Sequence, residues 1–89
     1  QKVINRNKAQ IRYCYETELQ RNQNLEGRIA MSWIIGGNGS VMKVSVREST
    51  MGAPAVERCI AGKIKHWKFP QPSGGGQVQV NYPFVLRAG

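Results

Sequence analysis

The chain has 89 residues, enough for one small domain with a modest hydrophobic core. Its 13 Lys and Arg residues outnumber 5 Asp and Glu, and the formal net charge of +8 points to anionic partners in general. The sequence contains no apolar run of about 18 residues, so it predicts no membrane-spanning helix, and no signal peptide is visible. Because it starts at Gln1 rather than methionine, we expect a piece of a longer protein.

The basic residues are spread singly along the whole chain, and Arg6 and Arg87 lie near its two ends. No RNP-type aromatic motif or zinc-finger spacing accompanies them, so an anionic envelope surface or an acidic partner explains the charge better than a nucleic acid. One His and two Cys do not make a zinc site, and the glycines at 74–76 lack the Lys and helix of a phosphate-binding loop. We therefore expect no metal and no cofactor.

A helix is predicted over residues 2–22. Its apolar stripe consists of Ile4, Ile11, Tyr15 and Leu19, with Cys14 at its edge. Asn7 is a poor helix former and a candidate N-cap, with Gln10 three residues later, so the sequence leaves the first turn open.

A β-hairpin is predicted over residues 25–48. The alternating apolar residues of its first strand are Ile29, Met31, Trp33 and Ile35. The Gly-rich turn at 36–39 contains Asn-Gly, which favours a tight reversal. The returning strand places Met42, Val44 and Val46 on one face, and Val41 joins them only if a bulge follows the turn.

A second helix is predicted to start at Pro54. Proline suits the first turn of a helix because the N–H groups of that turn have no acceptor within the helix. Its apolar stripe consists of Val56, Cys59, Ile60, Ile64 and Trp67. Phe69-Pro70 ends it, and a Gly-rich loop leads to an alternating strand over residues 77–86.

Pro83 lies within this last strand and cannot donate to a ladder, so the strand is predicted at a sheet edge. Backbone groups of alternate residues point to opposite sides of a strand. On that geometry the backbone groups of Val78, Val80 and Tyr82 form hydrogen bonds with the hairpin. The residues that present the free edge are Gln77, Gln79 and Asn81.

The order helix, strand, strand, helix, strand predicts an α+β fold, a three-stranded antiparallel sheet with two helices on one face, as a single domain over residues 1–89.

The whole chain resembles the C-terminal domain of TonB-type energy transducers, and is most similar to the AgmX/PglI C-terminal domain of myxobacterial gliding-motility proteins. The segments that carry the resemblance are 11–16 with Leu19, 25–28, 36–41, 59–60, 67–70 and 80–84. Typical TonB domains lack the cysteine pair, which favours the gliding-motility branch.

The resemblance implies a periplasmic domain of a protein tethered to the inner membrane, where upstream segments meet a motor complex. It also implies contact with an outer-membrane or periplasmic protein, by addition of a partner strand to the last strand. The residues expected to bind the partner are Gln77, Gln79, Asn81 and Pro83. Lys68 and Arg87 are expected near this edge, where they would speed encounter with an acidic partner.

Cys14 and Cys59 lie on the inner stripes of two helices expected to pack side by side. In the oxidising periplasm that the resemblance implies, we favour a Cys14–Cys59 disulfide over two buried free thiols. A catalytic pair of cysteine with His66 is a third alternative, but no orienting carboxylate or oxyanion loop supports it.

Three function classes stay open at this point. A protein-interaction module is favoured, because a free strand edge suits β-strand addition. A basic domain binding an anionic polymer, nucleic acid or cell-envelope polymer, is the alternative, and a steep salt dependence of affinity would distinguish it. An enzyme is disfavoured for want of an acid–base or metal constellation.

Overall fold

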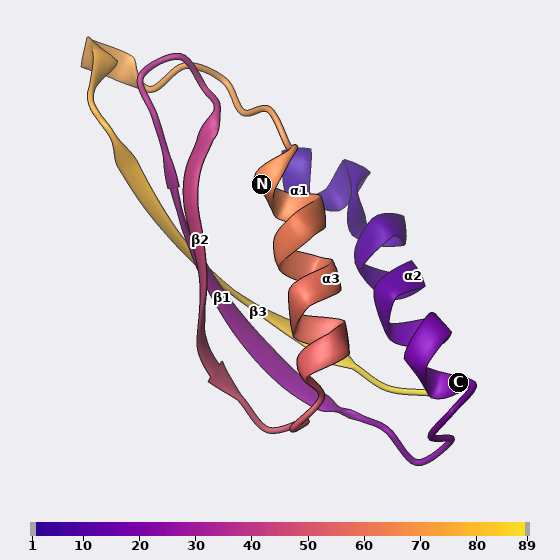
Figure 1. The fold of residues 1–89 in the computed structure, drawn as a ribbon. Helices are drawn as coiled ribbons and strands as arrows, with labels where there is room; N and C mark the ends of the chain where they lie inside the picture. Colours follow the sequence, from indigo (N-terminus) through magenta and orange to yellow (C-terminus); the bar gives the residue numbers. More distant parts are fainter. Residues whose placement is uncertain (1, 89) are drawn as a thin grey trace.

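In the computed structural model, which describes residues 2–88, a three-stranded antiparallel sheet carries its helices on one face (Figure 1). The elements are α1 (Lys2–Arg6), α2 (Lys8–Leu19), β1 (Gly27–Ile35), β2 (Val41–Ser49), α3 (Pro54–Lys65), a 3-10 turn (Ser73–Gly75) and β3 (Val78–Leu86). The strand order is β2-β1-β3, with β1 in the centre. The predicted α+β fold class is confirmed. No helix over residues 2–88 is long and apolar enough to cross a membrane.

The predicted first helix is broken at Asn7 and ends at Leu19 rather than at residue 22. Asn7 leaves helical geometry at φ −108° and ψ 11°, and its side-chain amide donates to the carbonyl of Val3 at 2.7 Å. The backbone N–H of Asn7 also donates to this carbonyl, at 3.2 Å, so the Asn7 side chain adds a second bond to the end of α1. Asn7 therefore occupies the predicted N-cap position of α2, but its side chain caps no backbone N–H of that helix.

A bulge, which the sequence made the condition for Val41 to join the buried face, follows the turn in β2. Ile35 pairs with Val41 and Ile34 with Lys43, so Met42 is the extra residue. The predicted burial of Met42 is wrong, because Val41 takes its place opposite the core residues and leaves the Met42 side chain 58% exposed. Val46 shares the face of Met31 but lies on an outer strand, and is 39% exposed.

The core lies between the helices and one face of the central strand β1. Ile29, Met31 and Trp33 of β1 are almost wholly buried, as the alternation predicted. The helices contribute Ile11, Tyr15, Val56, Ile60 and Ile64 to the same core. The hydroxyl of Tyr15 donates to the carbonyl of Leu25, which ties α2 to the start of the hairpin.

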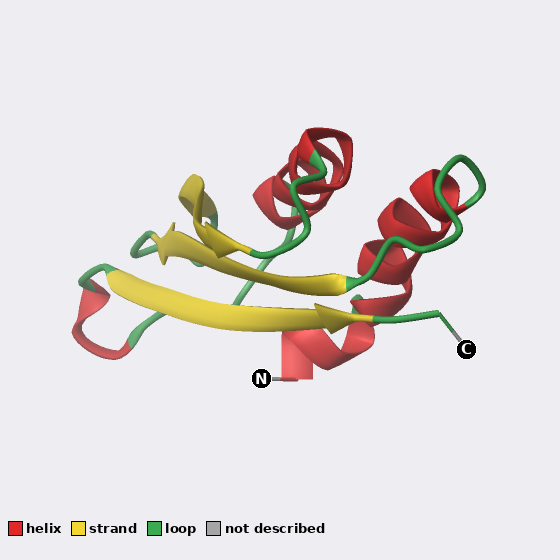
Figure 2. Ribbon diagram, turned by 90° about the horizontal axis from the view of Figure 1, so that it is seen from below, coloured by secondary structure: helices red, strands yellow, loops and turns green. Residues whose placement is uncertain are grey.

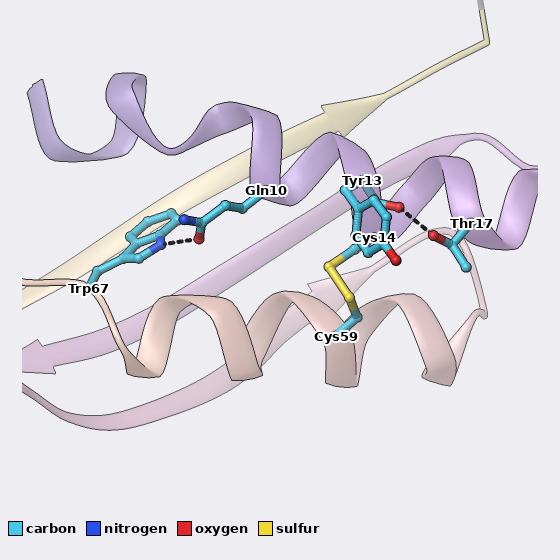
Figure 3. Close-up of a disulfide and its surroundings, with 6 residues drawn as sticks. All are labelled: Gln10, Tyr13, Cys14, Thr17, Cys59 and Trp67. Carbon is cyan, nitrogen blue, oxygen red and sulfur yellow. Dashed lines mark hydrogen bonds between the residues drawn. A yellow bond between two sulfur atoms is a disulfide. The ribbon is translucent and has the colours of Figure 1, made fainter.

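The predicted pairing of Cys14 with Cys59 is present as a disulfide between α2 and α3 (Figure 3). The two Cα atoms are 5.6 Å apart, and 45 positions separate the cysteines in the sequence. In the chain-entropy treatment a link closing a loop of this length stabilises the fold by about 4 kcal/mol. The bridge therefore fixes the two helices side by side over the sheet.

Candidate interaction edge on the last strand

β3 lies at the edge of the sheet, and within residues 2–88 no further strand pairs with its outer side (Figure 2). It pairs with β1 over nine consecutive positions, from Gly27↔Leu86 to Ile35↔Val78, without a register shift. A regular strand of this length presents an unbroken row of backbone groups at its free side.

The side to which each β3 residue turns its backbone N–H and C=O groups follows from the hydrogen bonds of β1. The N–H of Thr50 donates to the carbonyl of Arg28 at 2.9 Å, and the N–H of Gly36 donates to the carbonyl of Ser40 at 2.8 Å. Even-numbered residues of β1 thus turn their backbone groups toward β2, and odd-numbered ones turn theirs toward β3. The register partners of those odd-numbered residues are Val78, Val80, Tyr82 and Phe84.

The alternate residues of β3 therefore direct their backbone groups away from the sheet. Gln79, Asn81 and Pro83 are the predicted edge residues that lie in the strand with this parity, and all three are exposed. Pro83 stands opposite Ala30, where its lack of an N–H leaves the β1–β3 ladder intact. Gln77 has the same parity but precedes the first residue of β3, so the structure does not place it in the strand.

The side chain of Gln79 is already engaged on the sheet. Its amide donates to the hydroxyl of Ser32 at 3.1 Å, across the helix-free face of β1. At the edge, Gln79 can therefore offer an added strand its backbone groups rather than its side-chain amide.

Val85 belongs to the same edge, although it is not among the residues predicted to bind a partner. It has the parity of Asn81 and Pro83, and its side chain is 57% exposed. The alternation of the strand is the sequence signal that identifies it.

The opposite edge of the sheet is less suited to accept a strand. Two register shifts interrupt the pairing of β2 with β1, and bulges of this kind twist an edge away from a flat template. The segment after α3 also covers the start of β2. Lys68 forms an isolated antiparallel β-bridge with Ser40, and the N–H of Phe69 donates to the carbonyl of Gly39 at 2.9 Å. β3 is thus the more regular of the two edges.

These contacts also correct one expectation about charge. The Lys68 ammonium donates to the hydroxyl of Ser40 at 2.7 Å, which places it at the start of β2 and not beside β3. Arg87 directly follows β3 and is exposed. Lys8 and Arg12 of α2 line the helix side of β3, and Arg28 and Arg47 line a hollow beside Asn81 and Pro83 on the other face. Sequence reasoning missed Lys8 and Arg12 at this strand because only tertiary packing brings α2 to it.

The disulfide removes the catalytic alternative for the cysteines. Both sulfur atoms are bonded to each other, so neither supplies a free thiol to His66, which lies exposed at the C-terminus of α3. Within residues 2–88, no cluster of three or more His, Cys, Asp or Glu side chains could hold a metal ion.

Comparison with solved structures places this geometry among known folds. The Pseudomonas aeruginosa TonB C-terminal domain superposes with a TM-score of 0.63 at 22% identity, over 83% of this chain and 76% of that chain. The longer of two Helicobacter pylori TonB C-terminal domain structures gives a TM-score of 0.55 at 20% identity, over 96% of this chain and 85% of that chain.

The fold is that of a TonB C-terminal domain. The shorter Helicobacter pylori structure agrees, with a TM-score of 0.55 at 20% identity over 86% of this chain and 88% of that chain. No family model and no curated protein matches the sequence. The TonB-like fold is thereby confirmed, whereas the similarity to the gliding-motility branch stays a prediction.

Proposed function

We propose that this chain is the protein-interaction module of a TonB-like energy or force transducer, and that it binds its partner by accepting a strand on the free edge of β3. The observation that carries the proposal is the regular nine-residue strand whose outward backbone groups, at Gln79, Asn81 and Val85, have no partner strand within residues 2–88. Backbone bonds to an added strand supply affinity, and alternate side chains supply specificity. The fold shared with TonB C-terminal domains agrees with the family resemblance, which implies this mode of binding.

The location we propose is the periplasm, with the protein tethered to the inner membrane through segments upstream of this domain. The Cys14–Cys59 disulfide supports it, because such bonds persist in oxidising compartments and are rare in the cytosol. In this proposal the upstream segments join an inner-membrane motor complex, and this domain contacts an outer-membrane or periplasmic protein. The cysteine pair and the sequence resemblance favour the gliding-motility type of transducer.

The test compares two substitutions at one position of the edge. Gln79→Pro removes the outward N–H, whereas Gln79→Ala removes the side chain and keeps the N–H. Each oxidised domain is used to capture proteins from envelope extract, and its fold is checked by circular dichroism. We expect wild type and Gln79→Ala to retain the same partner and Gln79→Pro to lose it. Equal capture by the two folded variants would contradict strand addition at this edge.

An anionic-polymer binder is the second candidate, and the observation that favours it is the net charge of +8. On the face of the sheet opposite the helices lie three basic residues, Arg28, Lys43 and Arg47. One of them, Arg28, forms an ion pair with Glu48 at 3.4 Å. Binding of this type loses affinity steeply as salt rises, roughly in proportion to the number of ionic contacts. A titration with an anionic polysaccharide or single-stranded DNA at two salt concentrations measures that slope.

A further inference from the structure

The bridge between α2 and α3 (Figure 3) joins two cysteines that differ in their access to solvent. Cys14 belongs to the core and is 1% exposed, whereas Cys59 is only partly buried. Thiol–disulfide exchange requires an attacking thiolate to reach one of the two sulfur atoms directly. In the folded domain the burial of Cys14 therefore leaves Cys59 as the residue at which a thiolate can attack.

The packing of the two helices explains this difference. Cys14 is one of the three buried residues of α2, together with Ile11 and Tyr15. The buried row of α3 consists of Val56, Ile60 and Ile64. Cys59 is not in this row, and lies beside it on the side of α3 that faces α2.

A cation accompanies Cys59. Lys63 lies one turn later on the same side of α3, and its Nζ is 5.6 Å from the centroid of the Tyr13 ring, so the ammonium lies over the seam between the two helices. Glu57, the one acidic residue of α3, comes two positions before Cys59 and so lies on the opposite side of the helix, where it lines a hollow against β2. A nearby cation favours the thiolate form of a cysteine, which is the form that takes part in exchange.

We propose that Cys59 is a thiol-exchange site, the residue through which a dithiol oxidoreductase opens and closes the bridge, and that Cys14 is the resolving cysteine. The site gives the domain a second kind of partner, which acts on the helix pair and not on the edge of the sheet. It is therefore independent of strand addition to β3, and its failure would leave the proposed function untouched.

The bridge opens in two exchange steps. A thiolate of the reduced oxidoreductase attacks Sγ of Cys59 and forms a new S–S bond to it. The bond to Cys14 breaks, and its electron pair goes to the Cys14 sulfur, which takes up a proton. The second thiolate of the oxidoreductase then attacks its own sulfur in the mixed disulfide and releases Cys59 as a thiolate. The bridge is thereby reduced to two thiols and the oxidoreductase is oxidised to its disulfide, and closing is the reverse sequence.

The position of Cys14 decides what happens after the first step. The Cα atoms of the two cysteines are 5.6 Å apart in the helix pair, so Cys14 stays beside the mixed disulfide and can attack Cys59 again. A monothiol is expelled by this return, whereas a dithiol completes the reduction with its second sulfur. We therefore expect glutathione to give a small amount of one mixed disulfide, at Cys59.

The first experiment measures each thiol alone, in the variants Cys14→Ala and Cys59→Ala. Each reacts with dithiodipyridine, a neutral disulfide reagent, and the rate is followed by absorbance in buffer and in denaturing urea. The urea rates give the reactivity of each thiol without the fold. Relative to them, Cys59 should react in buffer roughly a hundredfold faster than Cys14, whose thiol is reached only when the domain opens locally. Equal relative rates in variants that circular dichroism shows to be folded would overturn the site.

The wild-type protein provides a measurement that needs no substitution. The oxidised domain is treated with excess glutathione, quenched with acid, alkylated and digested with trypsin. Cleavage after Lys and Arg places Cys14 in peptide 13–21 and Cys59 in peptide 59–63, so mass spectrometry distinguishes the two adducts. We expect glutathione on peptide 59–63 and the alkyl group on peptide 13–21. Glutathione on peptide 13–21, or equally on both, would overturn the site.

The variant Lys63→Glu, made together with Cys14→Ala, tests the part of the cation. It should slow the reaction of Cys59 by roughly two- to fivefold at low salt, and by less at high salt. Lys43→Glu, on the helix-free face of the sheet, is the matched control and should leave the rate unchanged. Equal rates in the two variants would overturn the role assigned to Lys63.

Discussion

The indole N–H of Trp67 donates to Oε1 of Gln10 at 2.9 Å, which joins the residue just beyond α3 to the first turn of α2 (Figure 3). The Trp67 ring stands edge-on to Trp33 of the central strand, with centroids 6.0 Å apart and an interplanar angle of 90°. Phe69 lies 6.3 Å from the same ring. One side chain thus connects both helices to the sheet, at the end of the helix pair away from the disulfide.

Trp67→Ala should lower the free energy of unfolding by about 3–5 kcal/mol, because it removes a buried aromatic ring from the core. Trp67→Phe keeps part of the ring and loses the bond to Gln10, so it should cost clearly less. Urea unfolding followed by circular dichroism measures both. A loss below about 1 kcal/mol for the alanine variant would place Trp67 outside the core.

Reducing the Cys14–Cys59 disulfide should destabilise the domain by about 4 kcal/mol, because the unfolded chain regains the entropy of the open loop. The measurement compares urea unfolding of one purified protein with and without reductant, so that no substitution disturbs the buried site of Cys14. Intact mass after denaturing alkylation is the control for redox state. Two alkylated thiols in protein made in an oxidising compartment, without reductant, would contradict the bridge.

Two glycines should respond to alanine in opposite directions. Gly39 has φ +87°, and a Cβ there would meet the carbonyl oxygen of Phe69 at 2.1 Å, so Gly39→Ala must displace the segment that covers the start of β2. We expect it to cost more than about 1 kcal/mol of unfolding free energy. Gly62 lies within α3 with open space around it, and Gly62→Ala should stabilise by about 0.5–1 kcal/mol. Thermal melts of the two variants show the sign of each change.

Proline substitutions at two neighbouring positions of β3, made in separate variants, should have different effects on the stability of the fold. Val80 turns its backbone toward Trp33 in β1, so Val80→Pro removes an inward bond and should destabilise by about 3 kcal/mol or more. Gln79→Pro removes only an outward N–H and should leave the unfolding transition close to that of wild type. Urea unfolding of both variants is the check, and similar losses of stability would refute the assigned direction of the β3 backbone.

Periodicity in the sequence was enough to predict the sheet. The alternation from Ile29 to Ile35, and the single proline of the last strand, predicted the buried face of β1 and the edge position of β3. The alternation made the burial of Val41 depend on a bulge beside the glycine-rich turn, and the structure contains that bulge. Helical spacing put both cysteines on inward stripes, but the disulfide was favoured over free thiols mainly because the family resemblance implied an oxidising compartment.

Features that depend on single side-chain bonds or on tertiary packing were not predictable in the same way. At the break, the Asn7 side chain bonds to the carbonyl of Val3, and helix propensity alone does not decide between such local bonds and a continuous helix. The bond from Trp67 to Gln10 links residues 57 positions apart, and no local pattern indicates it. Lys8 and Arg12 reach the helix side of β3 only once α2 is placed against the sheet, so they gave no signal in the sequence.

Amide hydrogen exchange of β3, alone and with a partner captured from envelope extract, tests the central claim most directly. In the free domain the amides of Gln79, Asn81 and Val85 should exchange quickly, and those of Val80, Tyr82 and Phe84 slowly, because only the second set bonds to β1. The partner should slow exchange at Gln79 and Asn81. Protection confined to basic residues such as Arg58, Lys63 and Lys65, with Gln79 and Asn81 unchanged, would contradict strand addition to β3.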